Sequence, residues 1–240
     1  MSKRKCVLTA SLGVIGALLM SGTASAAVTG ISYTATVSPK KQSNKTFGAA
    51  SISNNIDTFY TGGFLPTPTE TAIVFSTDLK FTPGKLARCN LSQINSVPEA
   101  QANAACGASR VGQGGAVING GTLTGKVAVY NGTPSGSSPS VYLHVDVFTP
   151  AGAYAFSTTL TGVLNLSTNT LTVSIPPTGT SITHFDATIN KVKTGKKKGK
   201  TTYFVMARCH KKWVNSAVTR FADGSTKGAQ SVQKCKPKKK

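Results

Sequence analysis

The segment 122–148, TLTGKVAVYNGTPSGSSPSVYLHVDVF, holds two runs rich in Val, Thr and Tyr around a stretch of Asn, Gly, Pro and Ser. The first three residue types suit a pleated, half-buried surface, and the others mark turns. Similar short runs recur, without long helical periodicity, at 31–37, 72–75, 79–81, 154–166, 170–175, 182–191, 201–209 and 213–221. The pattern predicts an all-β, antiparallel, β-sandwich-like fold.

At most one short helix is expected, in the loop between Cys89 and Cys106. Ser96-Val97-Pro98-Glu99 has the spacing of a capping box with an early proline, and residues 100–105 favour helix. Two other segments show no strand pattern. Residues 37–55 are polar and are expected to be loosely held, and the glycine-rich stretch GQGG at 112–115 is expected to form a flexible turn.

The first 26 residues have the organisation of a secretory signal. Lys3, Arg4 and Lys5 precede an apolar run at 7–20, and the small-residue pattern Ala24-Ser25-Ala26 follows. The run is short for a membrane span, and no later segment is long and apolar enough to cross a bilayer. We therefore expect a signal peptide at 1–26, a single β domain at 27–235 and a basic tail at 236–240 of a secreted protein that is extracellular or envelope-associated.

The expected mature chain keeps four cysteines, Cys89, Cys106, Cys209 and Cys235. Secretion makes disulfides the first interpretation of an even number, although four cysteines allow three pairings. Short loops favour Cys89–Cys106 and Cys209–Cys235, each stabilising the fold by about 3 kcal/mol in the chain-entropy model. A zinc site is the alternative, but the spacings lack the close cysteine pairs of zinc knuckles.

The positive charge lies at one end of the chain. Residues 191–240 hold 16 Lys and Arg against one acid, a net charge of +15, whereas residues 27–190 carry +2. Such asymmetry favours contact with anionic polymers or surfaces. The alternative is a solvated surface that only aids solubility.

Two β runs flank a lysine-rich loop at 192–200, which predicts a hairpin with lysines at its tip. Together with the C-terminal tail, these lysines are the predicted polyanion contacts: Lys193, Lys196, Lys197, Lys198, Lys200, Lys236, Lys238, Lys239 and Lys240. The sequence favours a secreted, non-catalytic protein that contacts a wall polymer, acidic glycan or extracellular DNA. No sequence-specific nucleic-acid motif, cofactor site or catalytic group is predicted.

Two His-x-Asp pairs lie in strand-like runs: His144 with Asp146, and His184 with Asp186. Residues i and i+2 of a strand share one face, so neighbouring strands would bring four metal ligands together. This arrangement supports an alternative function, a secreted hydrolase or a metal-dependent carbohydrate-binding module. Otherwise the pairs are polar side chains on outer sheet faces, opposite Val145 and Phe185.

A strand ending in Cys209 is followed by Trp213, by Phe221-Ala222-Asp223-Gly224 and by Cys235. With the Cys89/Cys106 pair and Val127-Ala128-Val129-Tyr130-Asn131-Gly132, this pattern resembles a group of uncharacterised secreted β-proteins of actinobacteria. The resemblance covers most of the mature chain and implies no activity.

Overall fold

The computed structural model describes residues 27–62, 67–84, 86–176, 181–197 and 200–238. The predicted signal peptide at 1–26 lies outside these residues. The strands are β1 (Ala27–Ser38), β2 (Lys41–Gln42), β3 (Gly48–Thr61), β4 (Pro68–Val74), β5 (Leu79–Phe81), β6 (Arg110–Ile118), β7 (Leu123–Ser135), β8 (Ser138–Phe148), β9 (Tyr154–Asn165), β10 (Thr170–Ser174), β11 (Ile182–Ile189), β12 (Lys193–Lys197), β13 (Lys200–Tyr203), β14 (Val205–Ala207), β15 (Lys212–Phe221), β16 (Thr226–Lys234) and β17 (Lys236–Pro237). The helical segments are α1 (Leu91–Ile94) and α2 (Glu99–Cys106), with 3₁₀ turns at Gly107–Ser109 and Asn119–Gly121.

Thirteen strands form one antiparallel sheet, which confirms the predicted fold class. The strand order is β16-β15-β4-β10-β9-β8-β7-β6-β11-β3-β14-β5, and β1 pairs with β3. The strands β6 to β10 are consecutive neighbours, as short turns favour. The sheet folds over a shared core in which Ile52 of β3 and Leu143 of β8 lie with Ile73 of β4. Apolar side chains from both halves of the sheet therefore meet as in a sandwich.

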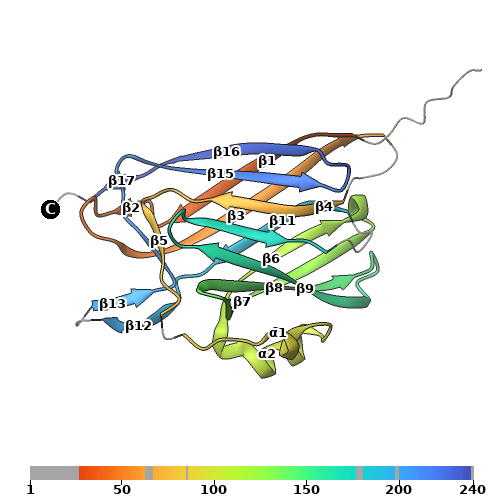
Figure 1. Ribbon diagram of the computed structural model, residues 1–240, viewed down its shortest axis with the longest axis horizontal. Helices are drawn as coiled ribbons and strands as arrows, with labels where there is room; N and C mark the ends of the chain where they lie inside the picture. Colours follow the sequence, from red (N-terminus) through yellow and green to blue (C-terminus); the bar gives the residue numbers. More distant parts are fainter. Residues whose placement is uncertain (1–26, 63–66, 85, 177–180, 198–199, 239–240) are drawn as a thin grey trace, which may run out of the picture.

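The first and last strands of the sheet, β1 and β16, lie side by side (Figure 1). Side chains of β16 join them. Ser231 Oγ accepts a hydrogen bond from the Ala35 amide at 2.9 Å, and Gln233 Oε1 accepts one from the Val37 amide at 2.6 Å. Gln233 Nε2 also donates to the Val37 carbonyl at 3.2 Å. The side chains satisfy the edge groups of β1 that a neighbouring strand would otherwise pair with.

The segment between Cys89 and Cys106 covers the outer face of β7 and β8 (Figure 1). It contains the expected helix, α2, preceded by the single turn α1. The predicted capping box does not form, because the helix begins after Pro98 and Ser96 has a φ of 60°. Instead the Glu99 amide donates to Asp146 Oδ2 on β8 at 2.8 Å. A carboxylate from another element thus takes the place of the local cap.

Both favoured disulfides are present, Cys89–Cys106 and Cys209–Cys235, with Cα–Cα distances of 5.3 and 5.9 Å. Two expectations about loops are wrong. Residues 37–55 include β2 and much of β3, where Ala50 and Ile52 are fully buried. The GQGG stretch lies inside β6 rather than in a turn. Within the described ranges, no helix is both long and apolar enough to span a membrane.

Glycines in β6 are required by the neighbouring strand. A Cβ atom on Gly112 would lie 2.1 Å from the Thr188 carbonyl oxygen of β11, and one on Gly114 would lie 2.0 Å from that of Asp186. Strands β6 and β11 therefore approach more closely than any side chain at these positions permits.

Candidate functional site

The lysine-rich segment forms its own small hairpin. Strands β12 and β13 pair only with each other, with Lys193 opposite Tyr203 and Lys197 opposite Lys200. The runs expected to flank the loop do not pair together: β11 lies between β3 and β6, and β14 lies between β3 and β5. Lys193 is exposed at the base of the hairpin, and Lys198 lies outside the described residues. The backbones of Lys196, Lys197 and Lys200 belong to the two strands.

A second group of lysines gathers where the two ends of the domain meet. Strand β17 pairs in parallel with β2, so Lys236 lies opposite Lys41. The Lys236 amide donates to the Lys40 carbonyl at 2.9 Å, and the Lys238 amide donates to the Gln42 carbonyl at 2.7 Å. The start of the predicted tail is therefore strand, while Lys239 and Lys240 lie outside the described residues.

We call this group the lysine end. Its members are exposed, and comprise Lys40, Lys41, Lys211, Lys212, Lys234, Lys236 and Lys238. Lys212 lies opposite Lys234 across β15 and β16, as Lys41 does opposite Lys236 across β2 and β17. Figure 1 shows β2, β17 and the β12–β13 hairpin at the same end of the molecule. The sequence analysis did not include Lys40 and Lys41 among the predicted contacts. They join the C-terminal lysines only because β2 pairs with β17.

Among the residues that the structure describes, no acidic side chain forms an ion pair with the lysine end. Like charges placed directly opposite on paired strands repel each other. The ion pairs among the described residues involve Arg110, Arg208, Arg220 and the three histidines, and none involves a lysine. The unopposed ammonium groups therefore create a positive field at this end of the molecule.

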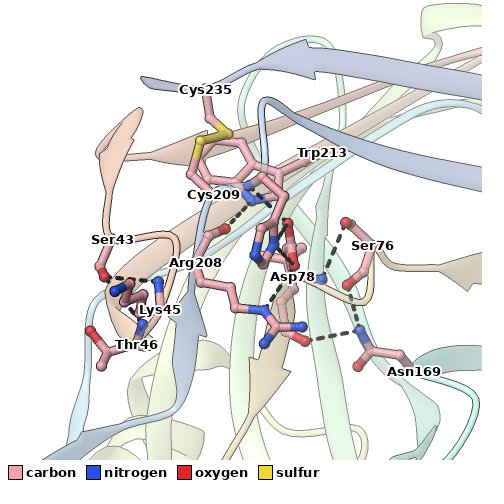
Figure 2. A network of polar contacts seen from close by, with 12 residues as sticks. Ser43, Lys45, Thr46, Ser76, Asp78, Asn169, Arg208, Cys209, Trp213 and Cys235 are labelled. Carbon is pink, nitrogen blue, oxygen red and sulfur yellow. Dashed lines mark hydrogen bonds and ion pairs between the residues drawn. A yellow bond between two sulfur atoms is a disulfide. The ribbon is translucent and has the colours of Figure 1, made fainter. Parts of the chain in front are cut away.

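A buried acid fixes the backbone beneath the lysines (Figure 2). Asp78 accepts hydrogen bonds from Arg208 Nε at 2.9 Å, and from the amide and Nδ1 of His210 at 3.1 and 2.9 Å. Burial alone would raise the pKa of Asp78, but the hydrogen bonds from His210 and Arg208 outweigh it and hold the pKa below its usual value. The carboxylate thus stays charged and is neutralised locally.

The disulfide and a tryptophan complete this scaffold. Figure 2 shows the indole of Trp213 beside the Cys209–Cys235 bond, and both belong to the main core. Trp213 Nε1 donates to the Arg208 carbonyl at 2.8 Å, and the Cys209 amide donates to the Ser43 carbonyl at 2.9 Å. The loop after β2 and the strand β17 are therefore held on one rigid base.

The two His-x-Asp pairs are not brought together. Strands β6 and β7 separate β11, which carries His184 and Asp186, from β8, which carries His144 and Asp146. No group of three or more metal-ligating side chains occurs among the described residues. The metal prediction therefore has no support in this fold.

The histidine of each pair has a different environment. His144 is fully buried beneath the α1–α2 segment, with Nδ1 3.2 Å from Thr159 Oγ1. Its Nε2 lies 3.2 Å from Asp146 Oδ1 without the alignment of a hydrogen bond. Burial lowers the pKa of His144 and keeps it neutral, despite the nearby carboxylate. By contrast, the hydrogen bond to Asp57 at 2.7 Å raises the pKa of the half-exposed His184.

Comparison with family models, with curated proteins and with solved structures finds no match for this chain.

Proposed function

We propose that the protein is a secreted, non-catalytic β-domain that binds anionic polymers through the lysine end and the neighbouring β12–β13 hairpin. The observation that carries the proposal is the pairing of β2 with β17, which adds Lys40 and Lys41 to the basic C-terminal segment. Two disulfides are consistent with an oxidising, extracellular compartment. The partner class is a wall polymer, an acidic glycan or extracellular DNA.

The energetics favour binding at this end. Each bound phosphate, sulfate or carboxylate relieves repulsion between opposed lysines and releases condensed counterions from the polymer. Four of these lysines project from paired strands rather than from a free tail, so less conformational entropy is lost when they bind: Lys41, Lys212, Lys234 and Lys236. The log of the affinity should then fall linearly with the log of the salt concentration.

The two ends of the β15–β16 hairpin provide a matched test. A Lys212→Gln/Lys234→Gln variant removes two charges at the lysine end, whereas Arg220→Gln/Lys227→Gln removes two charges at the opposite end of the same strands. The first variant should elute from heparin at lower salt and show a shallower salt slope with duplex DNA, by about 0.9 for each lost phosphate contact. The second should behave much more like the unchanged protein.

A third variant separates binding from folding. Lys41→Gln/Lys236→Gln removes an opposed like-charge pair, so its free energy of unfolding should be equal or slightly higher while its heparin retention falls. Equal retention of all three variants and the unchanged protein would show that the lysine end is only a solvated surface.

A further inference from the structure

A second surface of the molecule is polar but nearly balanced in charge. It is the outer face of β1, β3, β11, β6 and β7, which we call the polar face. The register aligns side chains across these strands, and one row contains Thr34, Asn55, Asp186, Gly115 and Lys126. Four interstrand spacings of about 4.8 Å make this row about 19 Å long. All five positions are at least partly exposed.

A surface hollow of about 520 Å³ lies on the polar face beside α2. This volume falls within the range of about 300–1,000 Å³ that is typical of ligand sites. The hollow is lined by Glu99, Arg110, Gln113, Gly114, Gly115, Lys126, Val127, Asp186, Thr188 and Asn190. By comparison, an apolar pocket lined by core residues such as Ile73, Leu143 and Leu160 has a volume of about 60 Å³.

Glycine opens the floor of the hollow. A Cβ atom on Gly115 would lie 3.1 Å from Asp186 Oδ1 and would crowd this carboxylate. Asp186 lies next to His184, whose Nε2 is 3.4 Å from Asp186 Oδ1. The glycine therefore leaves the Asp186 carboxylate accessible from the solvent side.

One wall of the hollow is organised in advance. Arg110 Nη1 forms an ion pair with Glu99 Oε1 at 2.8 Å and donates to Asn103 Oδ1 at 3.1 Å. Tyr130 also donates to Asn103 Oδ1, at 2.7 Å. These contacts restrict the rotamers of Glu99 and Arg110 before any ligand arrives, which lowers the entropy lost on binding.

Other polar groups around the hollow are available. Within the described residues, the side chains of Gln113 and Asn190 have no hydrogen-bond partner, and the Lys126 ammonium forms no ion pair and lies 5.1 Å from the centroid of the Phe148 ring. The lining thus includes two carboxylates (Glu99 and Asp186), two permanent cations (Arg110 and Lys126) and two amides (Gln113 and Asn190). Carboxylates accept hydrogen bonds, Arg and Lys donate them, and amides do both. Such a mixture suits neighbouring hydroxyl groups, because each hydroxyl both donates and accepts hydrogen bonds.

From this geometry we infer that the hollow binds a neutral oligosaccharide, with further sugar units extending along the row toward Asn55 and Thr34. The balanced charge disfavours the polyanions that the lysine end attracts. Val127 is the one large aliphatic residue among those that line the hollow, and its side chain is buried in the main core, so the hollow offers no aliphatic side chain to an apolar ligand. The inference is independent of the proposed function, since the two surfaces share no residue.

The test starts with the mature protein on an array of neutral oligosaccharides of glucose, N-acetylglucosamine, mannose, galactose and xylose, with heparin oligosaccharides and tetra-alanine as the other arms. A neutral sugar should bind and shift the backbone amide resonances of Gln113, Gly115 and Lys126. Gln113→Ala and Lys126→Ala should each weaken binding by about tenfold, the value of one hydrogen bond to a polar or charged partner. Heparin retention of Gln113→Ala should not change.

Thr36→Ala is the matched control, because Thr36 is an exposed residue of the same face outside the hollow. It should bind the sugar as the unchanged protein does. The inference is overturned if no neutral sugar binds, if tetra-alanine shifts the same resonances more strongly, or if the sugar shifts persist in both hollow variants. Circular dichroism of each variant separates lost binding from lost folding.

Discussion

At the scale of single residues, Asp78 shows how a buried charge is retained in this fold. Its side chain is 8% exposed, and three donors from Arg208 and His210 surround the carboxylate. A buried charge without partners is very costly, whereas a hydrogen-bonded one is tolerated. The network therefore anchors the segment before β5 to the connection 208–211, which leads from β14 into the lysine end.

Asp78→Asn should lower the free energy of unfolding at pH 7 by about 2 kcal/mol, because hydrogen bonds to a charged group are lost. The pKa of Asp78 is lowered in the folded state, so its stabilising effect is present above its unfolded pKa of about 3.9 and is lost as the pH falls through the folded pKa. Urea unfolding at pH 7 and below pH 4 measures this. A difference between the two proteins that does not narrow in acid would contradict the assignment.

At the scale of elements, α2 illustrates a helix that begins through a tertiary contact. Asp146 accepts the Glu99 amide at 2.8 Å and the Ser157 hydroxyl at 2.6 Å. The negative charge of this carboxylate also interacts favourably with the positive N-terminal end of the helix dipole. Asp146 therefore serves as a structural residue that fastens the α1–α2 segment onto β8, instead of the metal ligand that the sequence suggested.

Asp146→Ala should lower the free energy of unfolding by about 3 kcal/mol, because the Glu99 amide and the Ser157 hydroxyl lose their acceptor. Ser96→Gly tests the capping box that does not form: Ser96 has a positive φ that glycine adopts freely, so the change should stay within about 0.5 kcal/mol. Urea unfolding compares both. If both variants lost a similar free energy of unfolding, Ser96 would be the residue that caps the helix, contrary to this assignment.

At the scale of the whole molecule, the first and last strands hold the sheet in its folded-over shape. Ser231 and Gln233 of β16 bond to the backbone of β1, and β17 continues the contact as a true strand pair with β2. The bridging side chains protect an edge that would otherwise be open to pairing with another chain. The same contact brings the two halves of the lysine end together.

Replacing Ser231 and Gln233 by alanine should lower the free energy of unfolding by about 2 kcal/mol and speed hydrogen exchange at the Ala35 and Val37 amides. Gln230→Ala is the control, because Gln230 is an exposed neighbour on the same strand. If hydrogen exchange at the Ala35 and Val37 amides stays slow in the double variant, other contacts hold β1 against β16.

The sequence by itself predicted the fold class and a short helix between Cys89 and Cys106, and it favoured the cysteine pairing that the structure has without excluding the other two. Short runs of β-branched and aromatic residues, such as 140–148, report a local preference for pleated structure, and close cysteines bridge short loops. The local pattern wrongly predicted a turn within β6. Gly112 and Gly114 are glycines because the backbone of β11 lies too close for a side chain, and not because the chain turns there. The local pattern also failed to predict β3. Its many polar residues suggested a loose segment, although alternate residues are buried on its inner face.

Only the tertiary structure decided which side chains share a surface. The partner of β2 is β17, about 195 residues away, and nothing within a local window specifies that pairing. For the same reason the sequence did not predict the hollow beside α2, because residues from α2, β6, β7 and β11 line it. Strand pairing over such separations depends on the packing of the whole core, so sites built across it emerge only when the chain has folded.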